Sequence, residues 1–213
     1  MRTAVAQLNQ EMSALVERVR RSVVQISADR GGVGSGTIWR ADGMIVTNAH
    51  VVRGRGQRLQ VTLADGRTFS ARLLAQDKTY DLALLSIPAT GLPAVAVDDR
   101  QTLAPGEWIM GIGHPWGVAG AVTAGAVIDL GRPMERAGSP GQLLQVGLHL
   151  RPGHSGGPLV DAQGRLVGLS AMINGPDVGL GIPLHTISQF VAANLADETA
   201  QGRPDPETVQ AYI

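Results

Sequence analysis

Apolar side chains recur at spacings of three and four residues along the beginning of the chain. They are Val5, Leu8, Met12, Leu15, Val16 and Val19. This spacing places them on one face of a helix, so the pattern predicts a helix over residues 3–20, with Glu17 and Arg21 paired one turn apart. The apolar face can pack on its own chain or on another subunit, and the sequence leaves both open.

From Ser22 onward the pattern changes to short, β-branched segments that glycine interrupts, which is typical of strands. A first group of expected strands covers residues 22–28, 37–40, 44–47, 59–63, 68–75 and 82–87. A second group covers residues 108–112, 121–130, 143–146, 159–160, 166–172 and 180–182. Residues 88–106 lie between the groups and are rich in proline and glycine, a composition suited to a connector.

Two tight turns and a closing helix complete the pattern. Asp65-Gly66 and Gln163-Gly164 have the composition of hairpin turns, and helical spacing predicts a helix over residues 184–195. We therefore expect an all-β fold of two six-stranded antiparallel β-barrels with an N-terminal and a C-terminal helix. The expected units are an N-terminal helix (1–21), a first barrel (22–98), a second barrel with the terminal helix (99–196) and a flexible tail (197–213).

The charge balance argues against a polyanionic partner. The chain of 213 residues has 18 basic and 18 acidic side chains, so no long-range field favours nucleic acid or an anionic membrane. The N-terminus lacks the apolar core of a secretory signal, and no apolar run is long enough to span a bilayer. As written, the sequence predicts a cytoplasmic protein, although a chain trimmed of a leader would look the same and would fit a periplasmic location. Cysteine is absent, which excludes disulfides and a thiol nucleophile.

One glycine-rich segment has the composition of a nucleophile loop. It reads Gly153-His154-Ser155-Gly156-Gly157-Pro158-Leu159. A serine nucleophile needs a hydroxyl that protrudes into a cleft and nearby N–H groups that point at the developing oxyanion. Flanking glycines permit both, because they adopt turn conformations that other residues avoid. The simpler interpretation is a glycine-rich turn with an incidental serine.

Ser155 also needs a base and a group that orients the base, and the chain offers candidates for both. His50 follows an apolar strand at the start of a loop, and Asp81 stands directly before the buried run that begins at Leu82. Each also has a purely structural interpretation. His50 can be a partly buried histidine with a structural hydrogen bond, and Asp81 can be a turn residue that caps the start of a strand. Together, in the order His, Asp, Ser, the three fit a catalytic triad better than three separate structural roles.

At this point the chain resembles the HtrA/Deg family of trypsin-like serine proteases. The segments that carry the resemblance are Gly34-Ser35-Gly36-Thr37-Ile38, Thr47-Asn48-Ala49-His50-Val51-Val52, Asp81-Leu82-Ala83-Leu84-Leu85, Gly153–Leu159 and Gly181-Ile182-Pro183. The resemblance implies a chymotrypsin-like fold with His50 as general base, Asp81 as its orienting acid and Ser155 as nucleophile. It also implies an oxyanion hole from the backbone N–H groups of Gly153 and Ser155, with that of His154 close by.

The resemblance further implies how substrate binds. Leu150 would form the floor of a shallow primary pocket for small aliphatic side chains, and Leu169, Ser170 and Ala171 would offer a strand edge to an extended peptide. His154 stands where relatives usually carry Asn, so it can compete for Ser155 or change the resting loop. No PDZ-like domain follows the barrels in this sequence.

These features predict a serine endopeptidase that cleaves unfolded or extended protein segments through an acyl-enzyme. The alternatives are a peptide-binding or chaperone-like module, and a protease stored inactive with its oxyanion loop disordered. The resemblance also suggests a homotrimer held by N-terminal segments. His114, His149 and His185 fit loop or helix-start roles, and no histidine pair has a third ligand at metal-binding spacing, so we expect no metal and no cofactor.

Overall fold

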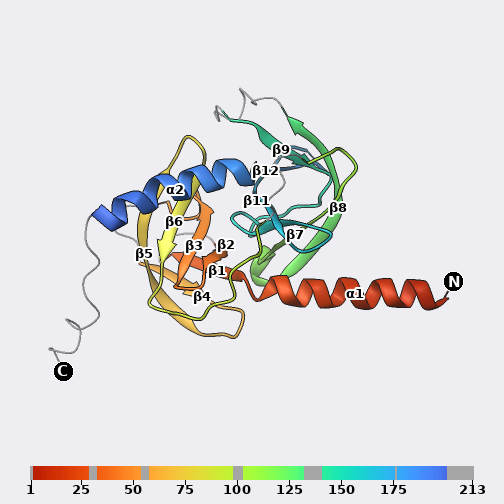
Figure 1. The fold of residues 1–213 in the computed structure, drawn as a ribbon, viewed down its shortest axis with the longest axis horizontal. Helices are drawn as coiled ribbons and strands as arrows, with labels where there is room; N and C mark the ends of the chain where they lie inside the picture. The colour runs from red at the N-terminus through yellow and green to blue at the C-terminus, as the bar shows by residue number, and fades with distance from the viewer. Residues whose placement is uncertain are drawn as a thin grey trace.

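The computed structural model describes residues 2–28, 33–53, 58–97, 103–131, 141–175 and 177–200. They form two closed barrels of six antiparallel strands each, flanked by two helices (Figure 1). The first barrel has the strand order β1-β2-β3-β6-β5-β4, and the second has the order β10-β11-β12-β9-β8-β7. The prediction of two six-stranded antiparallel β-barrels with a helix at each end is confirmed.

The strands lie close to the predicted segments. The first barrel contains β1 (Val23–Ala28), β2 (Val33–Arg40), β3 (Met44–Asn48), β4 (Leu59–Thr62), β5 (Thr68–Asp77) and β6 (Leu82–Ser86). The second contains β7 (Trp108–Gly113), β8 (Ala121–Gly131), β9 (Leu143–Val146), β10 (Pro158–Asp161), β11 (Leu166–Ile173) and β12 (Gly179–Pro183). A short 3-10 turn, η1 (Pro115–Gly117), follows β7.

Strand β2 begins four residues earlier than the sequence pattern predicts, at Val33 instead of residue 37. Glycine disfavours strands, which is why the pattern excludes this part. Inside the barrel, however, a side chain at Gly34 would meet Val51 at 2.6 Å, and one at Gly36 would meet Ile26 at 2.8 Å. The two glycines are therefore needed for close packing, and pairing with β1 holds the segment extended.

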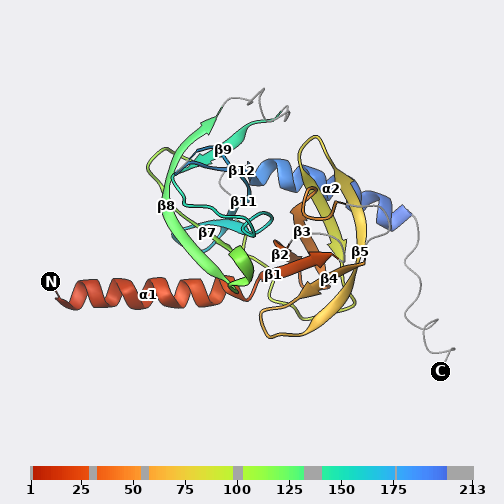
Figure 2. The same cartoon turned by 180° about the vertical axis from the view of Figure 1, so that it is seen from behind.

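Three apolar cores position the site. One fills the first barrel around Ile26, Ile45 and Leu85, and another fills the second around Leu144 and Leu159. A third core joins the two barrels to helix α2 (Leu184–Ala200) and is formed by residues from β3, β6, β11 and β12 with Ile187 and Val191 of the helix. Because this shared core ties the barrels together, residues on either side of the junction keep fixed positions. Figure 2 shows α2 running from the second barrel across the first.

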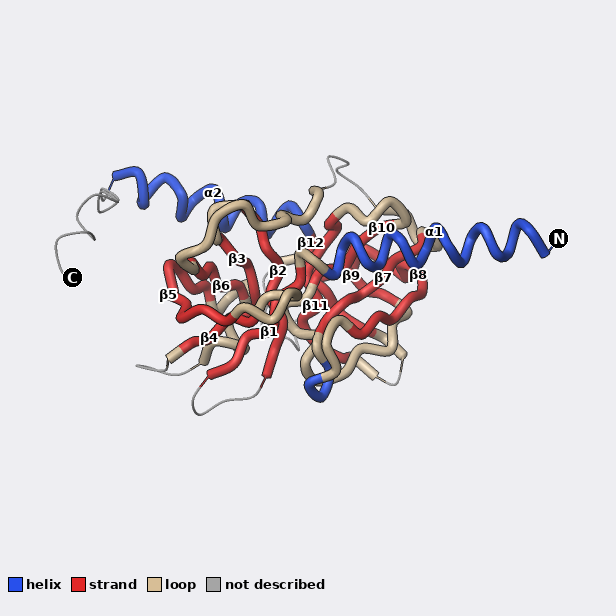
Figure 3. Tube along the Cα trace, turned by 90° about the horizontal axis from the view of Figure 1, so that it is seen from below, coloured by secondary structure: helices blue, strands red, loops and turns tan. Residues whose placement is uncertain are grey.

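Helix α1 (Arg2–Arg20) packs on the second barrel only with its C-terminal half. Leu15 and Val19 are buried against β7 and β10, whereas Val5 and Leu8 are 58% and 57% exposed. Figure 3 shows the first turns of α1 extending past the barrels. The predicted Glu17–Arg21 pair is wrong, because Glu17 binds Arg20 at 2.7 Å, one residue nearer along the helix.

Helix α2 continues to Ala200, beyond the predicted end at residue 195. Residues 197–200 are therefore helical instead of belonging to a tail, and the rest of the predicted tail, 201–213, lies outside the described residues. Neither helix has an apolar stretch of the length and hydropathy that a membrane span requires, within the residues described.

Candidate active site

His50 and Asp81 come together because the strands that lead to them are partners. Asn48, at the end of β3, pairs with Leu82, at the start of β6. His50, which follows β3, therefore comes close to Asp81, which precedes β6. The Nδ1 atom of His50 lies 2.7 Å from Oδ2 of Asp81, and the backbone N–H of His50 donates to Oδ1 at 2.9 Å. The carboxylate therefore orients the ring from two directions, which is the role an orienting acid has in a triad.

The backbone of Asp81 is held in an uncommon conformation, with φ at 54°. Two donors hold it there, because the N–H of Ala49 and the side chain of Asn48 both bind the Asp81 carbonyl, at 3.0 and 3.1 Å. A left-handed conformation at a non-glycine residue costs about 1–3 kcal/mol and persists only where the surroundings impose it. Strain at this residue therefore supports a functional role for its carboxylate.

Ser155 reaches the same region from the second barrel. Its hydroxyl donates to the carbonyl of Ala171 at 3.1 Å, and no hydrogen bond joins it to His50 within the described part of the chain. Two cavities adjoin here, because Ala171 and Met172 line both the one that contains Ser155 and the one that contains His50 and Asp81. A rotation about the Ser155 Cα–Cβ bond is the motion that would turn its hydroxyl away from Ala171.

The first barrel holds the Ser155 loop through β2. The N–H of Ser35 donates to the Ser155 carbonyl at 2.9 Å, and the hydroxyl of Thr37 donates to the Gly156 carbonyl at 3.1 Å. Gly156 has φ at 83°, and a side chain there would lie 2.2 Å from both the Ser35 carbonyl and the Thr47 hydroxyl. The glycine after Ser155 is therefore required by its own conformation and by the close approach of the other barrel.

The turn before Ser155 leaves two N–H groups without a partner in the part of the chain that the structure describes. The N–H of His154 donates to the Arg151 carbonyl at 3.0 Å, and Gly153 has φ at 105°. With Pro152 before Gly153, these are the features of a type II turn. The N–H groups of Gly153 and Ser155 donate to no acceptor among the described residues. They are the candidate oxyanion donors. The His154 N–H, which was expected close to the hole, is not a donor for it, because it bonds the Arg151 carbonyl within the turn.

The ring of His154 faces Arg151 and not Ser155. Its Nδ1 atom lies 3.1 Å from both the N and the O atoms of Arg151. Burial lowers the pKa of this imidazole, as does the nearby charge of Arg151, while a hydrogen bond to the Arg151 backbone acts in the opposite direction. A neutral ring fits this position, and it offers Ser155 no competing hydrogen bond.

A buried network that sequence reasoning missed holds the Gly153 carbonyl. The Ser35 hydroxyl donates to this carbonyl at 2.7 Å, and the N–H of His114 approaches the same oxygen at 3.2 Å. Ser35 also lies 3.1 Å from Nδ1 of His114. Burial, followed by charge interactions with His154 and with Arg20, lowers the pKa of His114 to about 4. Ser35 stands in a segment that carries the HtrA/Deg resemblance, and the sequence predicts a loop role for His114, but no sequence signal connects either residue to Gly153.

We expect Gly153→Ala to lower kcat by about 10²–10³-fold, the effect of losing one oxyanion donor. An alanine side chain there would lie 2.4 Å from the His114 carbonyl, so the turn has to change. Gly175→Ala is the matched control, because Gly175 also has a positive φ, 117°, but open space around it. Steady-state kinetics on a peptide substrate measures both variants. Equal kcat values for the two would contradict the assigned role of Gly153.

The cavity beside Ser155 has a volume of about 210 Å³. It is lined by Leu150, Arg151, Pro152, His154, Ser155, Ser170, Ala171, Met172 and Ile173. Leu150 is 3% exposed and belongs to the core of the second barrel, so this lining residue is held in place by the barrel's packing.

Leu169 does not line this cavity, although the sequence analysis includes it among the substrate-binding residues. It is fully buried and pairs with Pro158 of β10 on one side and Ile182 of β12 on the other. Ser170 is also engaged, because Gly156 and Gly157 bind its backbone at 2.8 and 2.9 Å. The edge available to a peptide therefore begins at Ala171.

The other histidines lie away from this cluster. Nδ1 of His149 is 3.1 Å from the carboxylate of Asp177, and His185 is exposed at the start of α2. Across the described ranges, no three His, Asp or Glu side chains gather closely enough to hold a metal ion.

Comparison with known proteins agrees with this geometry. Residues 34–169 match the family of the trypsin-like peptidase domain. The chain belongs to this family. Among curated relatives, HhoB of Synechocystis is 39% identical over 169 residues, which cover 77% of this chain and 40% of that protein. The chain spans about two fifths of the length of the first curated relatives that it matches.

Solved structures place the chain in the HtrA group of the trypsin-like peptidase family. The HtrA-type protease AlgW, solved with a tripeptide, has a TM-score of 0.79 and 30% identity, covering 84% of this chain and 62% of that one. The serine endoprotease from Yersinia pestis has a TM-score of 0.76 and 29% identity, covering 86% and 66%. The resemblance to HtrA/Deg proteases and the chymotrypsin-like fold are both confirmed.

Proposed function

We propose that this chain is a serine endopeptidase that cleaves unfolded or extended protein segments through an acyl-enzyme. The observation that carries the proposal is the half-buried, doubly hydrogen-bonded His50–Asp81 pair beside Ser155. Two N–H groups in the turn before Ser155, which donate to no acceptor among the described residues, add to it. An orienting acid, a base, a nucleophile and oxyanion donors are the four parts that acyl transfer needs. Family membership supports the same reaction.

In the proposed reaction, the Ser155 hydroxyl turns from the Ala171 carbonyl to Nε2 of His50. His50 takes the hydroxyl proton as Oγ bonds to the substrate carbonyl carbon, and Asp81 stabilises the imidazolium that forms. The N–H groups of Gly153 and Ser155 bind the oxyanion. The C–N bond then breaks, and His50 gives the proton to the leaving amine. Water, deprotonated by His50, hydrolyses the acyl-enzyme and restores the Ser155 hydroxyl.

The primary pocket is proposed to prefer small aliphatic side chains. Leu150, Ala171 and Ile173 give it apolar walls, and its volume of about 210 Å³ is small. None of its lining residues is acidic, so a lysine or arginine side chain would be desolvated there without a counter-charge.

Cleavage profiling on a peptide library is expected to show alanine and valine before the cut bond, with lysine and arginine depleted at least about tenfold. Leu150→Ala removes the floor and should shift the preference toward larger apolar residues. Since that variant loses core packing, its melting temperature is measured beside its profile. A wild-type preference for basic residues would contradict the proposed pocket.

A second candidate is a protease that rests inactive until a ligand or another subunit orders its site. The observation that favours it is the bond from Ser155 to Ala171, which keeps the hydroxyl away from His50. Labelling by a fluorophosphonate without casein degradation would favour this candidate. A peptide-binding or chaperone-like module would use the same free edge at Ala171–Ile173 without turnover, and the Ser155→Ala variant would then keep the full biological activity.

We further propose self-association through the exposed half of α1, in the form of a homotrimer. Val5 and Leu8 are more than half exposed on the apolar face of that helix. Light scattering is expected to give a mass near three chains for the wild type and a lower mass for Leu8→Lys. Gln10→Lys, on the opposite face of the helix, is the control and should keep the wild-type mass. A monomeric wild type would contradict the proposal.

A further inference from the structure

We propose that the cavity beside His50 selects substrates with an acidic side chain in the residue immediately before the one that fills the Ser155 cavity. The volume of the cavity beside His50 is about 350 Å³, and two cations, Arg53 and Lys78, line it together with His50. The proposal rests on the proposed function, because it assigns a charge preference to the substrate of the same site.

A fixed turn positions Lys78 at this cavity. Lys78 stands at the start of the turn and Asp81 at its end. Oδ1 of Asp77 accepts the backbone N–H groups of Thr79 and Tyr80, at 2.7 and 3.1 Å, and these two hydrogen bonds stabilise the turn. Because the turn ends on the residue that orients the base, the backbone of Lys78 has a defined place beside the triad.

Neither Arg53 nor Lys78 has an ionic partner in the part of the chain that the structure describes. Among the residues that line the cavity, Asp81 is the single acid, and its two oxygens are bound to His50 at 2.9 and 2.7 Å. The carboxylate of Asp81 is therefore engaged by the base, and the two cations leave this part of the cleft positively charged.

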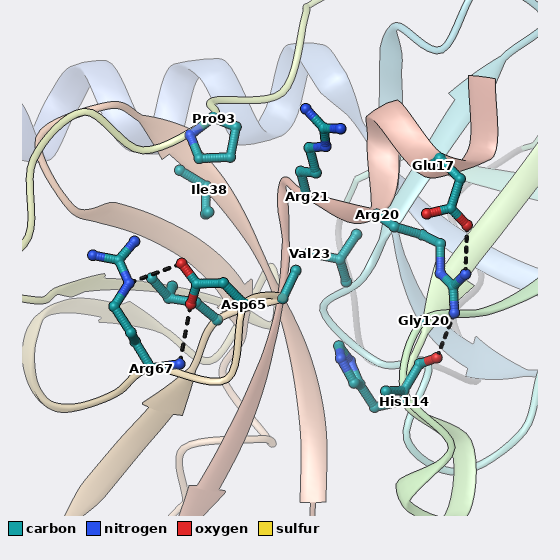
Figure 4. A pocket seen from close by; sticks show the side chains of 13 residues that line it. Glu17, Arg20, Arg21, Val23, Ile38, Asp65, Arg67, Pro93, His114 and Gly120 are labelled. Atoms are coloured by element: carbon teal, nitrogen blue, oxygen red, sulfur yellow. Dashed lines mark hydrogen bonds and ion pairs between the residues drawn. The ribbon is translucent and has the colours of Figure 1, made fainter. Parts of the chain in front are cut away.

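Two arginines at another cavity show the opposite arrangement. At the end of α1, Arg20 binds Glu17 at 2.7 Å, and Arg67 binds Asp65 at 2.8 Å (Figure 4). Each of those cations meets an acid of its own chain. The cations beside His50 have no such acid among the described residues, so the carboxylate of a substrate can serve as their counter-charge.

The position of the acidic residue follows from the alternation of side chains along an extended peptide. In the proposed binding mode, the acyl part of the substrate pairs with the edge that begins at Ala171, and one side chain enters the Ser155 cavity. The side chain of the preceding residue then points the opposite way. Ala171 and Met172 line both cavities, so the preceding residue lies beside the cavity that contains Arg53 and Lys78.

The expected effect is modest, because both cations are exposed. Exposed ion pairs change an affinity by about two- to fivefold each, and salt screens them. The attraction acts on the bound substrate before and during the reaction alike. It is therefore expected to lower KM and to leave kcat unchanged.

The test compares two peptides with alanine before the cut bond that differ only in the preceding residue, which is Glu in one and Gln in the other. At low salt we expect the wild type to have a KM about tenfold lower for the Glu peptide, and nearly equal values in about 1 M salt. Lys78→Gln and Arg53→Gln should each reduce this KM ratio by about two- to fivefold. Arg58→Gln is the matched control and should keep the wild-type ratio, because Arg58 is exposed and lies outside the cavity.

The chain offers a chemical version of the same test, because Lys78 is its only lysine. Acetylation removes the charge of Lys78, whereas reductive methylation keeps it. Acetylated wild type should have the KM ratio of Lys78→Gln, and methylated wild type should have the ratio of the untreated protein. Both reagents also modify the N-terminal amine, so Lys78→Gln protein is treated in parallel and should keep its own ratio.

Equal KM values for the two peptides in the wild type at low salt would overturn the proposal. An unchanged ratio in both Lys78→Gln and Arg53→Gln, or the same loss in Arg58→Gln, would overturn it too. Cleavage of neither peptide would instead count against the proposed function. Equilibrium binding of the two peptides to Ser155→Ala protein then tests the cations by themselves, with the same ratio expected and equal affinities contradicting the charge preference.

Discussion

Ser155→Ala is expected to abolish both covalent labelling by a fluorophosphonate and degradation of unfolded casein. The hydroxyl is the only protein group in the proposed reaction that bonds to the substrate carbonyl carbon, so kcat should fall by about 10⁴–10⁶-fold. Gel-based labelling and casein digestion measure the two activities. Folding should be unaffected, because the substitution removes a single hydrogen bond, to Ala171.

Ser70→Ala is the control for this experiment, since Ser70 is exposed on β5, away from the cleft. It should keep full labelling and full digestion. Normal casein turnover by Ser155→Ala would remove the basis of the endopeptidase assignment, whatever the labelling shows.

Asp81→Asn should lower kcat by about 10⁴-fold at neutral pH and leave KM nearly unchanged. The carboxylate accepts hydrogen bonds from both the backbone N–H and Nδ1 of His50. An amide has one oxygen for these two donors, and its NH₂ group favours the tautomer in which Nε2 of His50 carries the hydrogen. His50 can then no longer accept the Ser155 proton. Steady-state kinetics over a range of substrate concentrations separates kcat from KM.

Asp129→Asn, at an exposed position of β8, has the same change in charge and should keep wild-type kinetics. Asp81 also caps the end of β3 through its carbonyl, so thermal unfolding of both variants is recorded. A kcat for Asp81→Asn within a few-fold of wild type, in a folded protein, would show that the carboxylate does not orient the base.

Local sequence pattern was enough to predict most of the strands and the three triad candidates. Whether a segment forms a strand, and whether a histidine stands at its end, depends mainly on residues that are close in the sequence. Periodicity and motifs can therefore predict both. The glycine-containing start of β2 escaped this reasoning, because pairing with β1 holds it extended, and Val51 and Ile26 leave no room for a side chain at Gly34 and Gly36.

The contacts around the oxyanion turn needed the folded chain. The N–H of His154 is engaged by Arg151 only because of the turn type, and Leu169 is excluded from the cleft by strands on both of its sides. Ser35 and His114 both bind the Gly153 carbonyl. Along the chain, His114 is 79 positions and Gly153 is 118 positions away from Ser35. No spacing rule links such residues.

The sequence by itself determined which chemistry this protein can offer: two barrels, and a serine with a base and an acid in the right order. Those properties follow from residue type and short-range periodicity. Only the tertiary structure decided how the serine loop is held and which of its N–H groups have no acceptor among the described residues. Those properties depend on distances between atoms of different strands, which the shared core between the barrels sets.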